Sequence, residues 1–297
     1  MAKIIYALSG QGLGHRSRAL LIGRYLLEQG HDVIFGASGE AFPYVSKSFP
    51  GRTCKISGFY FLYRHGGLLG GKTMFENACS FPKNLARNLR VFDTVYKPFA
   101  PDMLITDYEP FSAWWAFLTG LPYISLDHQH LLTMCRLEHN LRDVFSRLPA
   151  TLITKFYYVG ARRYLILNFF KAAMTQKNAL LVPPIVRSVV MEQEVSEGDH
   201  ILYYSTDKTY HPERLPDIFN HFPAYRFRVY GFELDRVEGN CEFKSFSTDS
   251  FVRDLAGSKA VIATAGFTLI SECLYLKKRM LLLPIHRQYE QIINANY

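Results

Sequence analysis

The chain has 297 residues, of which 48% are hydrophobic, so it can bury one or two compact cores and is not a disordered protein. Its net charge of +8 favours acidic partners such as phosphate groups. Because the basic residues are spread along the chain and accompany no nucleic-acid-binding motif, the composition argues against nucleic acid and leaves a nucleotide ligand or an anionic membrane.

The amino-terminal half of the chain alternates strand and helix patterns. A strand at 4–8, a glycine-rich turn at 10–14, a helix at 18–29 and a strand at 33–35 form a βαβ unit. The alternation continues with strands at 53–56, 103–106, 123–126 and 179–182 and with helices at 76–96 and 111–118. This pattern predicts a doubly wound, Rossmann-like α/β domain over residues 1–190.

A second alternation follows a polar, acidic run at 191–199, which is predicted to be a linker. Strands are predicted at 201–204, 226–230, 241–243, 261–262 and 280–283, and helices from Pro212 and at 251–256 and 268–276. Residues 200–297 therefore read as a second Rossmann-like α/β domain. This domain is short for its architecture, so we expect its carboxyl-terminal part to be incomplete.

The glycine-rich turn ends in Gly14 and His15, just where a helix begins. A dinucleotide fingerprint has glycine at the position of His15 and an acidic residue closing the second strand, and both are missing here. The turn instead presents an imidazole at the carboxyl edge of the sheet. Asp107 follows the strand at 103–106 and reaches the same edge, where it can orient the imidazole and stabilise its protonated form. A hydrogen-bonded histidine at a helix start is the alternative.

A second candidate site follows the strand at 261–262. The chain runs into Gly266, and a helix then opens and carries Glu272 in its second turn. The free amides of such a helix start suit a diphosphate, and Glu272 can accept hydrogen bonds from ribose hydroxyls. A further turn supplies Glu290 and Gln291.

These segments resemble the UDP-glycosyltransferase superfamily with the GT-B fold, including the bacterial group that adds N-acetylglucosamine to the lipid-linked peptidoglycan precursor. Residues 266–272 are similar to the glycine-to-glutamate helix start of that family, and residues 290–295 to its Asp/Glu-Gln-x-x-Asn-Ala element. Gly14 and His15 match its amino-terminal Gly-His pair, which carries the catalytic base in many members. The resemblance implies two Rossmann-like domains that face a cleft.

The resemblance also implies roles for individual residues at the donor. The diphosphate would be held by Gly266, Phe267 and Thr268, the ribose by Glu272, and the sugar hydroxyls by Glu290 and Gln291. Weaker matches are Ser205 and Thr206 near the phosphates and Phe251 and Val252 at the nucleobase. Thr264 replaces a histidine of many plant members, and Arg18 follows the Gly-His pair where proline is usual, which suggests an anionic acceptor or extra donor contacts.

The predicted function is the inverting transfer of a sugar from a nucleoside diphosphate, with UDP favoured, to an acceptor hydroxyl. His15 would deprotonate the hydroxyl and Asp107 would stabilise the imidazolium. No Asp-x-Asp element is evident, so neither a metal nor another cofactor is expected. A UDP-sugar epimerase of the same fold and a non-catalytic nucleotide-sugar-binding protein remain as alternatives.

Two further segments bear on the acceptor. His128 and His130 flank the end of a strand beside Asp127; they lack a third zinc ligand and are assigned to the acceptor side, with a polar loop as the alternative. In residues 155–177 aromatic and basic residues interleave. Such a face would suit an anionic membrane and a lipid-linked acceptor, as in synthesis of cell-envelope glycans or glycolipids, whereas a buried core helix with solvated basic residues is commoner for this pattern.

The cysteines and the amino terminus bear on location. The five cysteines are scattered, without a C-x-x-C pair, which is typical of reduced thiols. The apolar segment at 4–8 is too short for a signal peptide. The sequence therefore predicts a cytoplasmic protein, with peripheral attachment to the inner face of the membrane as a variant.

Overall fold

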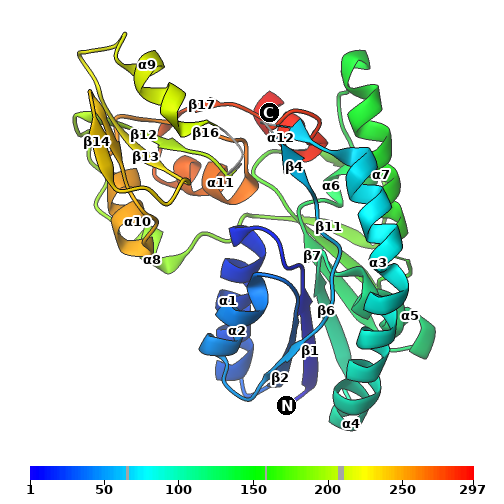
Figure 1. Ribbon diagram of the computed structural model, residues 1–297. Helices are drawn as coiled ribbons and strands as arrows, with labels where there is room; N and C mark the ends of the chain where they lie inside the picture. The colour runs from blue at the N-terminus through cyan, green and yellow to red at the C-terminus, as the bar shows by residue number, and fades with distance from the viewer. Residues whose placement is uncertain (65–66, 158, 207–210) are drawn as a thin grey trace. The chain divides into compact units, whose positions relative to one another are not determined.

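A computed structural model describes residues 1–64, 67–157, 159–206 and 211–297 (Figure 1). The chain forms two compact units: the first comprises Met1–Leu62 and Gly70–Pro184, and the second comprises Tyr63–Leu69 and Ile185–Tyr297. The predicted linker at 191–199 thus lies within the second unit. Its backbone is attached there, since the Ser196 amide donates to the Ala256 carbonyl at 3.1 Å and the Gly198 amide to the Gly257 carbonyl at 2.9 Å.

The first unit is built on a parallel seven-stranded sheet. Its strands are β1 (Lys3–Leu8), β2 (Asp32–Ala37), β3 (Thr53–Lys55), β6 (Met103–Asp107), β7 (Tyr123–Asp127), β9 (Arg163–Leu167) and β11 (Ala179–Val182), in the spatial order β11-β9-β7-β6-β1-β2-β3. The chain winds from β1 toward one edge and then returns to β6 on the other side of β1. The order therefore reverses between β1 and β6, and ligands of such sheets bind outside the carboxyl ends of the strands at this point.

Helices cover both faces of this sheet (Figure 1). They are α1 (Leu13–Glu28), α2 (Ala41–Ser48), α3 (Gly70–Val91) with its continuation to α4 (Lys97–Phe99), α5 (Pro110–Thr119), α6 (Leu131–Met134) and α7 (Val144–Tyr157). One core lies between α1, α2 and the first strands, where Tyr6, Leu8 and Phe35 are fully buried. Near-continuous apolar strands of this kind are typical of sheets covered on both sides.

The second unit repeats the same winding. Its strands are β12 (His200–Tyr204), β13 (Arg226–Tyr230), β14 (Arg236–Glu238), β15 (Cys241–Phe243), β16 (Ala260–Ala263) and β17 (Arg279–Leu282), in the order β14-β15-β13-β12-β16-β17. All neighbours pair in parallel except β14 with β15. The order reverses between β12 and β16. The prediction of two doubly wound α/β folds is confirmed.

The helices of the second unit are α8 (Ser188–Met191), α9 (Leu215–Phe219), α10 (Thr248–Ala256), α11 (Phe267–Tyr275) and α12 (Tyr289–Asn296). The short hairpin of β4 (Tyr63–Arg64) and β5 (Gly67–Leu68) belongs to this unit, and its Leu68 amide donates to the His286 carbonyl at 3.0 Å.

One predicted segment takes a different form from either alternative. Residues 155–177 do not make one helix, amphipathic or buried: α7 ends at Tyr157, and the chain then forms β9 and the short β10 (Ala173–Met174). The prediction of a single helix was wrong because the apolar residues Tyr164, Ile166 and Leu167 belong to a core strand that pairs with β7. β9 was missed for the same reason.

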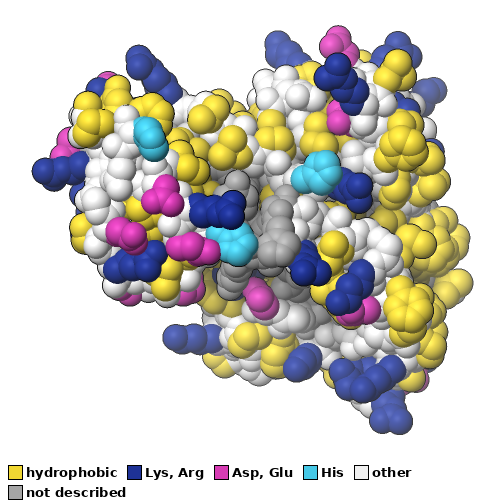
Figure 2. Space-filling view, turned by 45° about the horizontal axis from the view of Figure 1, so that its top comes forward, with side chains coloured by type: hydrophobic (Ala, Val, Ile, Leu, Met, Phe, Trp, Pro, Cys, Tyr) yellow, Lys and Arg dark blue, Asp and Glu magenta, His cyan; other side chains and the backbone are white. Residues whose placement is uncertain are grey.

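Two observations concern the surface. On the face shown in Figure 2 lysine and arginine side chains are distributed rather than gathered into one patch. Within the described ranges, no helix has the length and apolarity needed to cross a membrane.

Candidate active site

His15 and Asp107 meet at the point where the first sheet reverses its order. His15 lies in the first turn of α1, and Asp107 is the last residue of β6, which pairs with the neighbouring β1. Their side chains are joined by a contact of 2.6 Å between His15 Nδ1 and Asp107 Oδ1. The carboxylate is fully buried, whereas the imidazole is 12% exposed. The two residues that the sequence singled out are therefore in direct contact.

The glycine-rich turn allows α1 to start close to this edge. A Cβ atom on Gly10 would lie 2.7 Å from the backbone carbonyl of Ser38, so only glycine fits there. Gly12 has a φ of 91°, a conformation that side chains disfavour, and the chain enters α1 immediately afterwards. The helix therefore begins at Leu13 rather than at the predicted residue 18, and this brings His15 into its first turn.

Arg18 lies one helical turn after His15 and points at Asp107. Its Nε donates to Asp107 Oδ2 at 2.8 Å and its Nη2 to Asp107 Oδ1 at 2.5 Å, while the Tyr6 hydroxyl donates to Oδ2 at 3.2 Å. Burial by itself would raise the pKa of Asp107, but Arg18 and then His15 hold it below its ordinary value. Asp107 is thus an anion. The sequence placed Arg18 on the acceptor side and missed this pairing, although the i, i+3 spacing from His15 is its signal.

The contacts of His15 select one tautomer. The ionised Asp107 carboxylate can only accept, so the 2.6 Å contact requires His15 Nδ1 to be the donor. Arg18 Nη2 is also a donor, so its 3.1 Å approach to Nδ1 is not a hydrogen bond when Nδ1 carries a proton. We therefore assign the proton of the neutral ring to Nδ1. This leaves Nε2 with the lone pair that can accept a proton from a substrate.

The turn after β6 completes the surroundings of His15. Tyr108 has a φ of 55°, which is unusual for a side chain of this size, and its ring stacks on the imidazole at 6.1 Å between centroids. Glu109 then caps α5 by accepting from the amides of Phe111 at 2.9 Å and Ser112 at 2.8 Å. Burial raises the pKa of Glu109 to about 7. Neither Tyr108 nor Glu109 stands in a motif that would have singled it out.

His128 and His130 are both buried at the end of the neighbouring strand β7. His130 Nδ1 contacts Asp127 Oδ2 at 2.7 Å, and the Ser125 hydroxyl donates to the same oxygen at 2.8 Å. His128 Nδ1 contacts the Leu167 carbonyl at 2.7 Å. Both histidines are therefore hydrogen-bonded at the end of the strand that pairs with β6. Among the residues that the structure describes, no group of three histidine, cysteine or acidic side chains could hold a metal ion.

The second unit brings together two loops where its sheet reverses order. Ser205 and Thr206 follow β12, and Gly266 begins α11 after β16 without a side-chain cap. Thr264 links the loops, since its Oγ1 accepts from the Thr206 amide at 3.3 Å and lies 3.1 Å from Thr206 Oγ1. Phe267 and Thr268 form the first turn of α11, and such a helix start attracts anions.

Glu272 is buried on α11 and is held by an arginine that the sequence did not single out. Arg187 Nε donates to Glu272 Oε1 at 2.6 Å and Arg187 Nη2 to Oε2 at 2.8 Å. Glu272 is 1% exposed and Arg187 is 18% exposed. The carboxylate that the resemblance assigns to a ribose is therefore engaged in a two-bond ion pair. This ion pair could not be predicted from the sequence, because Arg187 and Glu272 are 85 residues apart in the chain.

Other donor-side residues support the loops around α11. Gln291 Oε1 accepts from the Ile285 amide at 3.0 Å, and Asn294 Nδ2 donates to the Ala265 carbonyl at 3.0 Å. Glu290 is half-buried in the first turn of α12. The side chains of Phe251 and Val252 are buried in α10, and the Phe251 amide donates to the Ser247 carbonyl at 2.9 Å, so the structure does not display either residue as a nucleobase contact.

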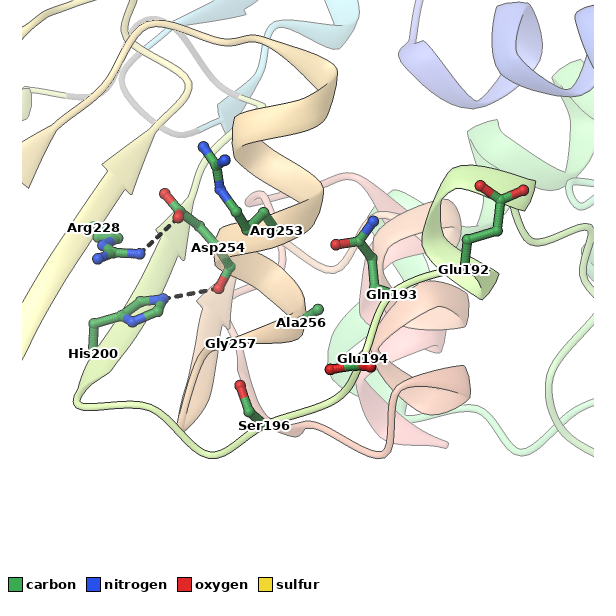
Figure 3. Close-up of a pocket in the computed structure, with 10 residues that line it drawn as sticks. All are labelled: Glu192, Gln193, Glu194, Ser196, His200, Arg228, Arg253, Asp254, Ala256 and Gly257. Carbon is green, nitrogen blue, oxygen red and sulfur yellow. Dashed lines mark hydrogen bonds and ion pairs between the residues drawn. The ribbon is translucent and has the colours of Figure 1, made fainter.

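A cavity of about 620 Å³ lies elsewhere in the second unit (Figure 3). His200, the first residue of β12, lines it, so it opens at the amino ends of the strands and not at the edge that holds Thr206 and Gly266. Asp254 on its wall accepts from Arg228 at 2.6 Å, from the Tyr230 hydroxyl at 2.6 Å and from Lys244 at 2.7 Å. The carboxylate is thus satisfied by the protein itself.

The chain matches a known protein family over almost its whole length. The family described as glycosyl transferase family 1 matches residues 2–297. Two similar proteins are described as uncharacterized glycosyltransferases. The Methanosarcina mazei protein is 29% identical over 166 residues, which cover 52% of this chain and 39% of that protein. The Methanosarcina acetivorans protein is 25% identical, over 99% of this chain and 80% of that protein.

Solved glycosyltransferase structures share the fold. The kitacinnamycin glycotransferase superposes with a TM-score of 0.68 at 13% identity, covering 99% of this chain and 84% of that chain. A Phytolacca americana enzyme complexed with UDP-2-fluoro-glucose and pterostilbene gives 0.67 at 14% identity, covering 99% and 83%. MurG of Acinetobacter baumannii gives 0.54 at 14% identity, covering 99% and 83%.

These likenesses confirm the GT-B fold, and the family match confirms the prediction of a glycosyltransferase. The fold, the Gly-His turn and the glycine-led helix α11 agree with that assignment. The chain belongs to glycosyl transferase family 1.

Proposed function

We propose that this protein transfers a sugar from a nucleoside diphosphate, with UDP as the favoured carrier, to an acceptor hydroxyl with inversion at the anomeric carbon. The observation that carries the proposal is the His15–Asp107 contact of 2.6 Å at the point where the first sheet reverses its order. A base held in one tautomer by a buried carboxylate is the arrangement that general-base catalysis needs.

The reaction is a single displacement. The acceptor hydroxyl gives its proton to His15 Nε2 while its oxygen attacks the anomeric carbon, and the bond from that carbon to the diphosphate oxygen breaks. The nucleoside diphosphate leaves with the bonding electrons. Asp107 stabilises the imidazolium that forms. Arg18 keeps that carboxylate ionised and oriented through two hydrogen bonds.

The second unit is assigned to the donor. The start of α11 at Gly266, with the hydroxyls of Thr206 and Thr264 beside it, offers amides and a helix dipole to the diphosphate. The same groups stabilise the charge on the leaving group without a metal ion in this proposal. Glu272 meets the ribose, and Glu290 and Gln291 meet the sugar, as the resemblance implies. A lipid-linked or glycan acceptor of the cell envelope is the acceptor class that we propose to test first.

The experiment begins with calorimetry against UDP, GDP and dTDP sugars, which identifies the donor without an acceptor. Transfer is then assayed with lipid-linked and glycan acceptors for the wild type and for His15→Ala, and the anomeric configuration of the product is read by NMR. We expect the variant to bind the donor as the wild type does and to lose transfer. Transfer retained by His15→Ala would refute the assignment of the base.

The same assay separates the alternatives. Formation of an epimeric nucleotide sugar from donor alone would identify an epimerase. Donor binding without hydrolysis, epimerisation or transfer to any acceptor would identify a binding protein. A retained anomeric configuration in the product would refute the single displacement.

A further inference from the structure

Helix α7 turns an apolar face outward. Phe145, Leu148, Leu152 and Phe156 are 89%, 57%, 56% and 61% exposed, and their spacing of three to four residues puts them on one face of the helix. Leu141, in the turn that leads into α7, is 91% exposed. These five residues are called the outward stripe below. The buried positions of the same helix include Thr154 and Tyr157, so the helix is amphipathic with its more apolar face directed away from the core.

The charge around the outward stripe has one dominant sign. The helix itself contains Arg147 and Lys155 and no acidic residue. In the chain, Arg142 precedes it and Arg162 and Arg163 follow it, all three exposed, whereas the acidic residues that precede it are the half-buried Asp143 and the exposed Glu138. Apolar side chains flanked by basic ones are the pattern of a surface that enters the headgroup region of an anionic bilayer.

Neighbouring helices extend this surface. On α5 the side chains of Phe117 and Leu118 are 44% and 76% exposed. Trp114 connects α5 to the stripe, because its indole N–H donates to the Phe156 carbonyl at 3.0 Å and its ring lies 5.6 Å from the Phe156 ring. Figure 2 shows hydrophobic and basic side chains together along the side of the first unit that holds α3 and α7. Exposed apolar side chains gathered on neighbouring helices in this way mark an interaction site.

The inward face of α7 leads toward His15. The Tyr157 ring lies 5.3 Å from the Tyr108 ring, and Tyr108 stacks on the imidazole of His15 at 6.1 Å. One helix therefore has the outward stripe on one side and contacts the surroundings of the proposed base on the other. This arrangement suits an acceptor that is itself anchored in a membrane, a consequence that rests on the proposed function.

We propose that the outward stripe docks this protein on the surface of an anionic lipid bilayer. The apolar side chains insert between the headgroups, and Arg142, Arg147 and Lys155 pair with anionic headgroups. The bilayer is favoured over a second copy of the chain because a like-charged copy would bring these basic residues against one another. This docking surface differs from the membrane-binding face that the sequence suggested at 155–177, because only residues 155–157 of that segment belong to α7.

The test is co-sedimentation of the whole protein with vesicles of phosphatidylcholine alone and with vesicles that also contain phosphatidylglycerol. We expect the protein to bind anionic vesicles about tenfold more tightly than neutral vesicles. Added salt should weaken its binding to the anionic vesicles. The double variant Phe145→Glu/Leu152→Glu should reduce binding to anionic vesicles by at least about tenfold. The matched control Ile218→Glu/Phe222→Glu changes two residues of the second unit that are 52% and 53% exposed, and it should bind as the wild type does.

A second measurement protects the test from a folding defect. When anionic vesicles are added, the tryptophan emission of Phe145→Trp should shift to the blue relative to that of the wild type. Circular dichroism should show that the double glutamate variant is folded. Absence of vesicle binding by the wild type, or equal binding by the wild type and the glutamate variant, would overturn the proposal. So would a dimer in sedimentation that the glutamate variant dissolves without any binding to vesicles. Donor binding is measured separately, so failure here leaves the proposed reaction untouched.

Discussion

The two units wind their sheets in the same order, but they carry different chemistry where that order reverses. In the first unit this point holds three ionisable side chains in mutual contact, His15, Asp107 and Arg18. In the second unit it holds a helix start at Gly266 and the hydroxyls of Thr206 and Thr264. The winding therefore sets where each unit can hold a site, whereas the side chains at that point decide between proton transfer and anion binding.

Removal of the Asp107 carboxylate in the first unit should reduce activity most strongly. Asp107→Asn should lower the rate of transfer by about a thousandfold, because the amide no longer stabilises the imidazolium or holds its tautomer. Donor affinity, which we assign to the second unit, should change by less than about twofold. Steady-state kinetics and calorimetry measure the two effects. Asp32→Asn, at a partly exposed carboxylate paired with Arg52, is the control. A large loss of donor affinity would break the division of labour between the units.

The next effect concerns the stability of the first unit. Arg18→Met leaves the buried Asp107 without its two guanidinium bonds and should lower the free energy of unfolding by about 3 kcal/mol at neutral pH. Asp107 stabilises the fold above its unfolded pKa because its folded pKa is depressed, and this contribution is lost as the pH falls through the folded pKa. The variant should lack it. Urea denaturation measures the change, and Arg24→Met, at an exposed position of α1, should be nearly neutral.

Glu109 should make the stability of the first unit depend on pH in the opposite direction. Its pKa is raised by burial to about 7, so the folded state favours the protonated form. Stability is therefore fullest below the unfolded pKa near 4.3, falls as the pH rises from there to about 7, and levels off above it, with a total loss of roughly 3 kcal/mol. Glu109→Gln should flatten this dependence in urea denaturation between pH 5 and 8, with Glu28→Gln as the exposed control. An unchanged slope in Glu109→Gln would show that other groups produce it.

A weaker effect is expected from replacing Glu272 in the second unit. If the Glu272 carboxylate accepts a hydrogen bond from the ribose, Glu272→Gln should weaken donor binding by about tenfold, the value of one hydrogen bond to a charged group. The transfer rate at saturating donor should change little. Calorimetry with the preferred nucleotide sugar measures the affinity, and Glu242→Gln, at an exposed carboxylate, should bind normally. Unchanged affinity in Glu272→Gln would mean that the ion pair with Arg187 is the main role of Glu272.

Much of the fold followed from local patterns. Apolar runs separated by helical periodicity identified most strands of both sheets, and Ala179–Val182 forms the edge strand β11 as expected. The predictions failed where a pattern had two meanings. The segment at 155–177 mixes apolar and basic residues, and nothing local distinguishes a surface helix from a core strand that extends into a polar loop.

Strand order along the chain was enough to predict that His15 and Asp107 lie close together, because a residue after one parallel strand and a residue ending its neighbour reach the same sheet edge, and the 2.6 Å contact agrees. The sequence also determined the helix start at Gly266. Three features became visible only in the folded protein: Arg18 binds Asp107, Arg187 pairs with Glu272, and the apolar face of α7 points outward. The physical reason is that periodicity reports which side chains share a face, whereas the partner of a charged group and the direction of a face depend on segments distant in the chain.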